Sequence, residues 1–347
     1  MIFILPGDVD DPELPSGGNV YDRRLSRELA ALGRPVREVA VAGSWPHPSA
    51  SARAALDRAL GSAAPGSLVV IDGLVACGVP EIVVPHAARL RLVVLVHMPL
   101  ADETGASVAL DALERATLRA ASAVVTPGAR TASRLVRHHG LPPERVHVVT
   151  PGTDPAPLSS GEELLCVASL TPHKGQDVLV EALAAVADLE WTCRLVGPVR
   201  RSPAFAARVR ELVARRGLAG RVTITGPLVG APLAQAYERA GLLVLPSRSE
   251  TYGMVVTEAL ARGIPVLTSV ETEALGRAAD GSVPGIVVPP GEVDALARAL
   301  RRWLTSPEWR SVLRRAARSR RGELVTWRTA ARVMERILDE PERGGVS

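Results

Sequence analysis

The sequence predicts an α/β protein of two doubly wound domains, each with a parallel sheet covered by helices on both faces. Short apolar segments alternate along most of the chain with longer amphipathic ones, as βα units do. The length of 347 residues is too great for one ordinary core and suits two domains of about 150 residues each. A segment rich in proline and glycine at 150–161 interrupts the alternation and forms the natural linker.

The first half of the chain alternates regularly between the two kinds of segment. Its apolar runs predict strands at 2–5, 36–41, 67–71, 92–97, 123–126 and 146–149. Helices are expected at 20–32, 50–60, 108–121 and 129–138. The first helix carries Tyr21, Leu25 and Leu29 on one face, and Gly33 ends it. The opening letters MIFILPGDVDD turn acidic after a short apolar run, which favours a first strand over a signal peptide.

The second half repeats the alternation after the linker. Strands are expected at 164–169, 191–196, 221–225, in the apolar runs on either side of the 246–262 loop and helix, and at 286–288. Helices are expected at 175–187, 203–216, 231–239, 292–305, 308–320 and 326–338. Thr326 provides an N-cap before Trp327 in the last of these.

Residues 242–269, LLVLPSRSETYGMVVTEALARGIPVLTS, are the most informative segment. They predict a strand, a loop, a helix that begins near Tyr252, Gly253 and Met254, and a second strand. Ligands of open parallel sheets bind beyond the carboxyl ends of strands, where helix N-termini present free amides. Glu250 and Glu258 bracket this turn, and carboxylates accept hydrogen bonds from hydroxyl groups. Amides with two spaced carboxylates suit a polyol joined to a phosphate, as in a nucleotide sugar.

The Glu-x7-Glu spacing, with LPS before it and EALARGIPV after it, resembles family 4 of the retaining glycosyltransferases, which have the GT-B fold. The resemblance extends over nearly the whole chain. It implies an acceptor-binding domain at 1–155, a nucleotide-sugar-binding domain at 156–322 that faces it across a cleft, and a helix at 323–347 that crosses back to the first domain. It also implies that Glu258 holds the ribose hydroxyls and Glu250 the donor hexose.

The same resemblance covers the loop around Glu250. The backbone amides of Tyr252, Gly253 and Met254 would contact sugar and phosphate, with Val255 completing the donor site. Thr251 stands where the family has a glycine, so its side chain narrows the sugar pocket or restricts the backbone there. The segment 222–228 resembles the family's base-recognition loop, whose backbone contacts leave the nucleobase undetermined.

Lys174 is the single lysine of the chain, in a sequence whose other basic side chains are arginine. It lies between an apolar strand and a helix, where a cation can meet phosphate oxygens. An ordinary surface lysine is the alternative. The stretch resembles the family's diphosphate-binding segment, with Lys174 at the lysine position and Ser169 at the usual arginine position. Arg248 or the helix N-terminus is then expected to compensate.

Further candidates lie in the first half. Gly17 and Gly18 precede the first amphipathic helix and allow a ligand close to the backbone, although turn glycines without a ligand are common. They do not form GxGxxG, so NAD is not supported. His97 ends an apolar strand and is expected to point into the cleft rather than the core; by resemblance it lies beside the donor sugar. Asp102 and Glu103 either contact acceptor hydroxyls or cap the following helix.

Several partners and cofactors are not expected. No His/Cys/Asp cluster with metal-ligand spacing is recognised in the sequence, so we expect no metal and no cofactor besides the nucleotide-sugar co-substrate. Aromatic residues make up 3%, too few for a nucleic-acid role. The net charge of +4 allows only a weak contact with anionic headgroups. Three cysteines without ligand spacing indicate buried thiols in a reducing cytoplasm. The oligomeric state is left open.

The function predicted is a cytoplasmic, metal-independent glycosyltransferase that retains configuration by front-face attack and moves a hexose from a nucleotide-diphosphate sugar. His97, Glu250 and Lys174 are the expected catalytic residues. The acceptor, a lipid, a glycan or a small molecule, is open. One alternative is another GT-B enzyme of nucleotide sugars, such as a hydrolysing epimerase or a pseudo-transferase. A second alternative is a non-catalytic partner protein that binds sugar nucleotides.

Overall fold

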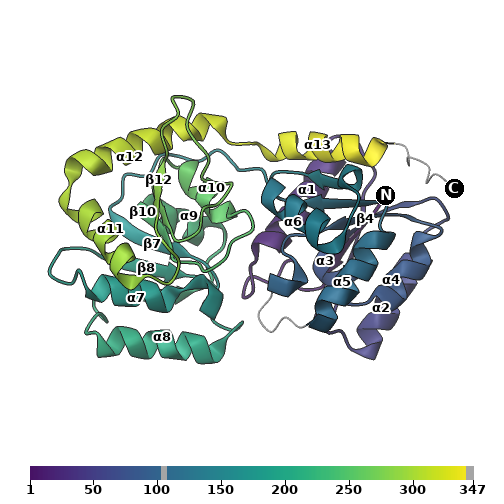
Figure 1. The fold of residues 1–347 in the computed structure, drawn as a ribbon, viewed down its shortest axis with the longest axis horizontal. Helices are drawn as coiled ribbons and strands as arrows, with labels where there is room; N and C mark the ends of the chain where they lie inside the picture. The colour runs from purple at the N-terminus through teal and green to yellow at the C-terminus, as the bar shows by residue number, and fades with distance from the viewer. Residues whose placement is uncertain (103–107, 341–347) are drawn as a thin grey trace. The chain divides into compact units, whose positions relative to one another are not determined.

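The computed structural model describes residues 1–102 and 108–340. The chain divides into two compact units. Unit 1 comprises residues 1–10, 17–152 and 325 onward, and unit 2 comprises 11–16 and 153–324. Each unit contains one sheet of six strands, and all neighbouring strands pair in parallel (Figure 1). The predicted α/β class with two doubly wound sheets is therefore confirmed.

Unit 1 holds the first sheet, here called sheet A. Its strands are β1 (Ile2–Pro6), β2 (Arg37–Val41), β3 (Leu68–Asp72), β4 (Arg91–Leu95), β5 (Ala123–Thr126) and β6 (Val146–Val148). Its helices are α1 (Gly17–Ala31), α2 (Ala50–Gly61), α3 (Gly73–Ala76), α4 (Pro80–Ala87), α5 (Val108–Ala120), α6 (Ala129–His139) and α13 (Trp327–Asp339), with 3-10 turns η1 (Leu100–Asp102) and η2 (Pro143–Arg145).

The strands of sheet A lie in the order β2-β1-β3-β4-β5-β6. Alternate residues of a strand point to opposite faces. Ile2 and Ile4 of β1 thus join Val69 and Ile71 of β3 in a core beneath α2 and α4. Both faces must be covered by helices, since every residue of β1 is buried.

The closing helix α13 belongs to unit 1 and packs against α1, so segments from the two ends of the sequence lie side by side (Figure 1). The predicted cap is confirmed, because the Thr326 side chain accepts from the backbone N–H of Thr329. Trp327 is 4% exposed and meets the ring of Tyr21 edge to face, with 5.9 Å between centroids. Its aromatic surface holds the helix to the unit.

Unit 2 holds the second sheet, here called sheet B. Its strands are β7 (Glu163–Val167), β8 (Cys193–Val196), β9 (Val222–Gly226), β10 (Ala240–Leu245), β11 (Val266–Thr268) and β12 (Gly285–Val287). Its helices are α7 (Gln176–Ala184), α8 (Pro203–Arg215), α9 (Gly230–Glu238), α10 (Met254–Leu260), α11 (Val293–Thr305) and α12 (Pro307–Arg320), with 3-10 turns η3 (Pro172–Lys174) and η4 (Arg321–Glu323).

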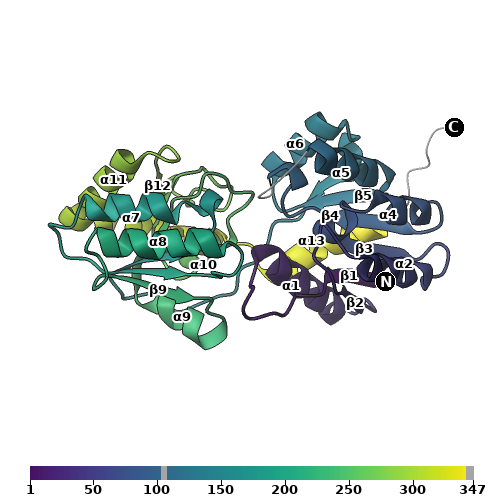
Figure 2. The ribbon, with the colours of Figure 1, turned by 90° about the horizontal axis from the view of Figure 1, so that it is seen from below.

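Sheet B has the order β12-β11-β10-β7-β8-β9 and separates two apolar cores. Leu242 and Val244 of β10 join the core formed with α7, α8 and α11. Leu243 and Leu245 face the other way, into the core formed with α9 and α10. Figure 2 shows α8 and α9 on opposite sides of β9. Strand β10 is buried over its whole length, which explains its unbroken apolar sequence.

Three expectations about local structure were wrong. Helices α3 and α4 lie in a stretch where no helix was expected. In α4, Pro80 occupies the first turn, where a missing N–H costs nothing, and Pro85 is tolerated in the interior of a short helix. Helix α1 begins at Gly17, so Gly17 and Gly18 form its first turn rather than a preceding loop. Strand β4 ends at Leu95, so His97 follows the strand instead of ending it.

No helix in the described part of the chain is long and apolar enough to span a bilayer. The three cysteines, Cys77, Cys166 and Cys193, are free and buried.

Candidate functional site

Both sheets have a topological switch point, where the strand order reverses and ligands of doubly wound folds bind. In sheet A the reversal lies between β1 and β3, and in sheet B between β7 and β10. The predicted site residues follow the carboxyl ends of β1 and β4 in unit 1, and of β7 and β10 in unit 2. We describe the two units separately.

At the switch point of sheet B, Lys174 and Glu250 form an ion pair. Lys174 follows β7 and Glu250 follows β10; the Lys174 Nζ and Glu250 Oε1 atoms are 2.7 Å apart. The Ser247 hydroxyl donates to the same Oε1 at 2.7 Å. Their side chains are largely buried, with exposed fractions of 21% for Lys174 and 10% for Glu250. A charge-assisted pair at this depth is stronger than a surface pair, and a phosphate or a hydroxyl that enters must exchange with it.

The backbone around Lys174 depends on Gly175. Gly175 has a φ of +68°, and a Cβ there would lie 2.2 Å from the carbonyl oxygen of Pro246. Only glycine lets the two loops approach so closely. A second link joins the same loops, because the Arg248 backbone N–H donates to the His173 carbonyl at 2.7 Å. The lysine is therefore held beside the β10 loop by backbone packing.

Glu258 lies on α10, eight residues after Glu250 in the sequence. The Tyr237 hydroxyl donates to its Oε2 at 2.7 Å. Burial raises the pKa of Glu258, while the Tyr237 hydrogen bond and the Arg262 guanidinium oppose that shift. Arg262 also lies over the Tyr237 ring, 4.6 Å from its centroid. One carboxylate oxygen of Glu258 is thus held by Tyr237.

The segment between the two glutamates carries the remaining predicted donor residues. Tyr252 is 7% exposed, whereas Thr251, Met254 and Val255 are partly exposed. Gly253 is the N-cap of α10. The predicted helix start around 252–254 is confirmed. The backbone amides of this first turn, rather than the buried Tyr252 ring, are the groups available to a ligand.

Ser169 stands at the family's usual arginine position, and Arg248 is the residue expected to compensate for it. The Arg248 side chain is exposed, and its Nη1 would lie 3.1 Å from a Cβ placed on Gly291. Ser169 is engaged through its backbone, since its carbonyl accepts from Gln176 Nε2 at 3.0 Å. Compensation for Ser169 by Arg248 remains a prediction.

At the switch point of sheet A, His97 meets two buried carboxyl groups. His97 Nε2 is 2.6 Å from Asp22 Oδ1 on α1 and 3.4 Å from Asp72 Oδ2 at the end of β3. The exposed fractions of the side chains are 20% for His97, 0% for Asp22 and 4% for Asp72. Burial raises the pKa of Asp22 to about 8, also raises that of Asp72, and lowers that of His97.

The first turn of α1 packs directly on this histidine. A Cβ placed on Gly18 would lie 3.0 Å from His97 Cδ2, so the glycine allows the ring to lie close against the helix. Tyr21 meets the ring edge to face, with 5.0 Å between centroids. The structure thus brings Gly18 and His97 together, although it places the glycines inside the helix.

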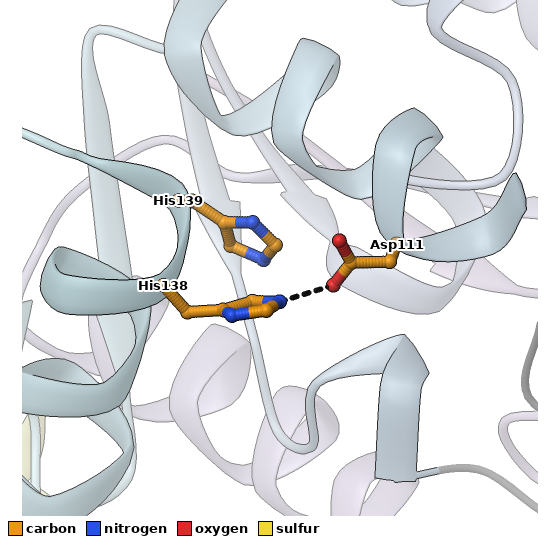
Figure 3. A group of neighbouring side chains, drawn as sticks. All are labelled: Asp111, His138 and His139. Carbon is orange, nitrogen blue, oxygen red and sulfur yellow. Dashed lines mark hydrogen bonds and ion pairs between the residues drawn. The ribbon is translucent and has the colours of Figure 1, made fainter. Parts of the chain in front are cut away.

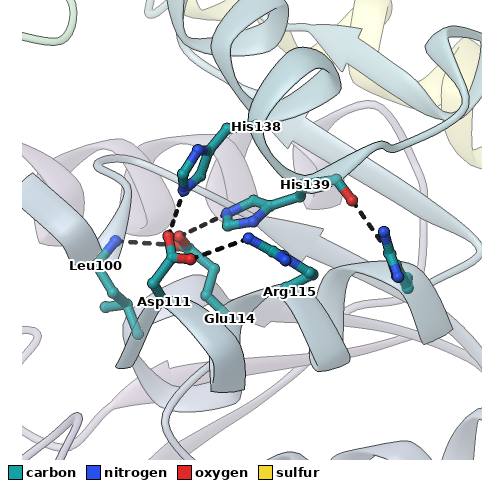
Figure 4. A network of polar contacts seen from close by, with 7 residues as sticks. Leu100, Asp111, Glu114, Arg115, His138 and His139 are labelled. Atoms are coloured by element: carbon teal, nitrogen blue, oxygen red, sulfur yellow. Dashed lines mark hydrogen bonds and ion pairs between the residues drawn. The ribbon is translucent and has the colours of Figure 1, made fainter. Parts of the chain in front are cut away.

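The segment after His97 is anchored by a buried network on α5 and α6, shown in Figure 4. Glu114 Oε1 accepts from the Leu100 backbone N–H at 3.0 Å, and its Oε2 is 3.0 Å from His139 Nε2. Both side chains are almost fully buried. Asp102 closes η1, and Glu103 lies outside the described residues, so their acceptor roles remain predictions.

Beside this network, Asp111, His138 and His139 bring three potential metal-ligand atoms together (Figure 3). Asp111 Oδ1 is 2.5 Å from His138 Nε2, and Arg115 Nη2 is 3.2 Å from Asp111 Oδ2. The Arg115 guanidinium neutralises the Asp111 carboxylate, and His139 Nε2 is paired with Glu114. We interpret the group as a structural tie between α5 and α6.

Two family models match this chain: Glycosyltransferase Family 4 over residues 15–157 and Glycosyl transferases group 1 over residues 156–320. The two matches meet at the linker and together span both switch points. The chain belongs to the GT-B glycosyltransferases of the family 4 type.

Relatives agree with this membership. A D-inositol 3-phosphate glycosyltransferase of Catenulispora acidiphila is 32% identical over 262 residues, which cover 69% of this chain and 62% of that protein. The corresponding protein of Jonesia denitrificans is 29% identical over 238 residues, with 62% and 56% covered. The chain thus aligns with about 60% of the length of these relatives.

Solved structures support the GT-B fold. The sucrose-phosphate synthase of Thermosynechococcus elongatus has a TM-score of 0.79 and 21% identity, with 97% of each chain covered. Anabaena HepE, solved with UDP and glucose, has a TM-score of 0.76 and 19% identity, with 97% of this chain and 98% of that chain covered.

Within this family assignment, the structure adds site residues that the sequence analysis did not find. Asp22 and Asp72 contact His97, Ser247 shares a carboxylate oxygen with Lys174, and Tyr237 holds Glu258. Asp72 gave one signal, an acidic residue closing an apolar strand run. Asp22 and Tyr237 lie on amphipathic helices, where a polar or aromatic residue gives no sign of its partner.

Proposed function

We propose that this chain is a retaining, metal-independent glycosyltransferase that moves a hexose from a nucleotide-diphosphate sugar to a hydroxyl acceptor. One observation carries the proposal: Lys174, Ser247 and Glu250 converge at the switch point of sheet B. A cation that shares a carboxylate with a hydroxyl, beside a helix N-terminus, suits a ligand with both phosphate and sugar hydroxyl groups.

In this proposal the donor exchanges with contacts already formed in unit 2. The Lys174 ammonium breaks its ion pair with Glu250 and binds the diphosphate oxygens. A hexose hydroxyl then donates to the Glu250 carboxylate. The ribose hydroxyls donate to the free oxygen of Glu258, whose other oxygen Tyr237 holds. Each charge-assisted hydrogen bond is worth about 1.5–3 kcal/mol net, so the exchange is favourable only for a ligand that supplies all the partners.

The chemistry follows from the same groups. The bond between the anomeric carbon and the phosphate oxygen breaks, and the acceptor oxygen forms its bond on the same face. The departing phosphate oxygen takes the acceptor proton. Lys174 and the amides at the start of α10 stabilise the charge that develops on the leaving diphosphate.

In unit 1, His97 with Gly18 is proposed to contact the reacting sugars, and the segment through Asp102 to contact the acceptor. The relatives suggest the first compounds to test. Anabaena HepE was solved with UDP-glucose, and several curated relatives are named D-inositol 3-phosphate glycosyltransferases.

The test is transfer from UDP-glucose, and then from other nucleotide sugars, to D-inositol 3-phosphate and to lipid, glycan and small-molecule extracts. Proton NMR of the product should show the anomeric configuration of the donor. Transfer should continue in EDTA. Glu250→Gln should lower the rate at least tenfold, whereas Glu211→Gln, in an exposed pair on α8, should not.

Inversion of configuration, or loss of transfer in EDTA that one divalent ion restores, would contradict the mechanism. Conversion of the donor alone, without an acceptor, would instead indicate an epimerase or hydrolase. Binding of the nucleotide without any turnover would indicate a non-catalytic partner protein.

A further inference from the structure

The carboxyl groups of Asp22 and Asp72 bring oxygen atoms within 4.8 Å of each other and of a His97 ring nitrogen. Asp22 Oδ1 and Asp72 Oδ2 lie 2.6 Å and 3.4 Å from the same atom, His97 Nε2, and Asp22 Oδ2 is buried without a donor among the described residues. Two buried carboxylates this close together disfavour each other's charge, and one histidine cannot balance both. One of the two groups must therefore carry a proton.

The surroundings decide which carboxyl group is charged. Asp72 Oδ1 accepts from the backbone N–H groups of Leu74 at 2.7 Å and Val75 at 3.2 Å, which favours its ionised form. Asp22 receives no backbone donor in the described part of the chain. Its Oδ2, which has no donor, is thus the oxygen available for a proton, while its Oδ1 is left to accept from His97 Nε2 at 2.6 Å.

The neighbouring charged and titratable groups are consistent with this arrangement. On α1, Tyr21 donates its hydroxyl to the Val149 carbonyl, and burial raises its pKa, so the ring stays neutral. Arg23 attracts Asp22 but pairs with Asp10 and Glu38. Beyond α3, burial raises the pKa of the Cys77 thiol, and Glu114 adds to that shift. No cation in the described residues is hydrogen-bonded to either carboxyl group.

We propose that Asp22 and Asp72 share one proton and thereby hold His97 as its Nε2–H tautomer, with Nδ1 as the hydrogen-bond acceptor offered to substrate. In a neutral imidazole, a hydrogen on one nitrogen leaves a lone pair on the other. Nε2 faces two carboxyl groups, and no described residue is hydrogen-bonded to Nδ1. Asp22 and Asp72 are then positioning residues, and only His97 touches the substrate.

The consequence for catalysis rests on the proposed function. A histidine locked in this tautomer accepts a hydrogen bond from a sugar hydroxyl and orients it, while the acceptor proton still passes to the departing phosphate oxygen. The opposite tautomer would present a donor at the same place, and the hydroxyl would then accept from the ring instead of donating to it. The two buried carboxyl groups thus determine whether His97 Nδ1 accepts a hydrogen bond from the substrate or donates one to it.

The first test needs no substrate. Long-range proton–nitrogen NMR spectra of ¹⁵N-histidine protein, with His97 assigned by His97→Gln, should show hydrogen on Nε2 and none on Nδ1 between pH 6 and about pH 7.5. Asp22→Asn copies the protonated carboxyl, because its amide N–H₂ can donate to Asp72 while its oxygen accepts from Nε2–H. It should keep the signature, whereas Asp22→Ala should lose it.

The second test is the pH profile of transfer. Wild-type kcat should fall as pH rises through about 8, where Asp22 loses its proton, and Asp22→Asn should lack that alkaline limb. Asp22→Ala should lose at least tenfold in kcat, more than Asp22→Asn does.

An Nδ1–H tautomer, or an Asp22→Asn variant as impaired as Asp22→Ala, would overturn the proposal, as would a stoichiometric divalent ion in the purified protein that Asp72→Asn removes. If no transfer is found with any donor, the proposed function fails, and the NMR result still tests the tautomer.

Discussion

The two switch points occupy equivalent places in two similar sheets, yet their charges are arranged in opposite ways. At the switch point of sheet B, the carboxylate of Glu250 is balanced by Lys174, and the two side chains, although largely buried, keep 10% and 21% of their surface exposed. At the switch point of sheet A, Asp22 and Asp72 are almost fully buried, and a histidine is their nearest basic group.

This difference shows how one topology can serve two tasks. Buried carboxylates must be paired or protonated, because low dielectric disfavours their charge. Unit 2 uses a cation, which an anionic ligand can take over. Unit 1 uses a proton, which a ligand cannot displace in that way and which fixes the neighbouring ring instead. The first arrangement suits donor binding, and the second suits orientation of a reacting group.

The largest effect should come from breaking the loop contact that places Lys174. Gly175→Ala combines a positive φ with a Cβ placed 2.2 Å from the Pro246 carbonyl. We expect a loss of about 3 kcal/mol in the free energy of unfolding, together with weaker nucleotide binding. Gly217→Ala is the control, since Gly217 has a φ of +69° but nothing within 4 Å; it should lose about 1 kcal/mol. Equal losses in urea denaturation would mean that the Pro246 contact is unimportant.

Removing the cation tests whether the switch point of sheet B is a phosphate site. Lys174→Met should weaken binding of a nucleoside diphosphate by about 2–3 kcal/mol and leave binding of the bare nucleoside nearly unchanged. Isothermal titration calorimetry measures both. Arg215→Met, which removes an exposed cation from α8, should change neither. Similar losses for nucleoside and diphosphate would contradict the assignment of Lys174 to the diphosphate.

Glu258 allows a finer test of the same site. Glu258→Gln should reduce nucleoside affinity by about 1.5–2 kcal/mol, because an amide replaces the carboxylate that accepts from ribose. Tyr237→Phe removes only the hydroxyl that orients Glu258 and should lose about 1 kcal/mol. Calorimetry with the nucleoside whose diphosphate binds best compares the two variants. A Glu258→Gln variant with wild-type affinity would remove this residue from the site.

The last expected effect concerns the pH dependence of the stability of unit 1. Asp22 has a pKa of about 8 when folded and 3.8 as its ordinary value, so the folded chain binds the proton more tightly. Its contribution to stability is complete below about pH 4 and is lost as pH rises to about 8. Asp22→Asn, which cannot titrate, should reduce this fall in the free energy of unfolding between pH 5 and pH 8. Urea denaturation measures this change. The same change in the free energy of unfolding for wild type and Asp22→Asn would argue against a raised pKa of Asp22.

Much of the fold could be predicted from the sequence because it depends on local patterns. Unbroken apolar runs such as the one in β10 predicted buried parallel strands, and the Thr326 cap marked the start of α13. The segments that carry Lys174, Glu250 and Glu258 were recognisable for the same reason, since Lys174 lies in the loop after β7, and Glu250 and Glu258 lie in the loop and helix after β10. Helix α4 was not predicted because it contains Pro80 and Pro85, and proline usually indicates that a segment is not helical.

The sequence by itself determined the two α/β halves and the position of each candidate residue at a strand's carboxyl end. Only the tertiary structure decided which of these residues meet. His97 contacts Asp22, 75 residues away in the sequence, and Lys174 contacts Glu250 across 76 residues. Such pairs leave no local pattern, because they depend on which strands become neighbours. The order of the strands is fixed by packing both faces of each sheet at once, and that order places a shared proton in unit 1 and a cation in unit 2.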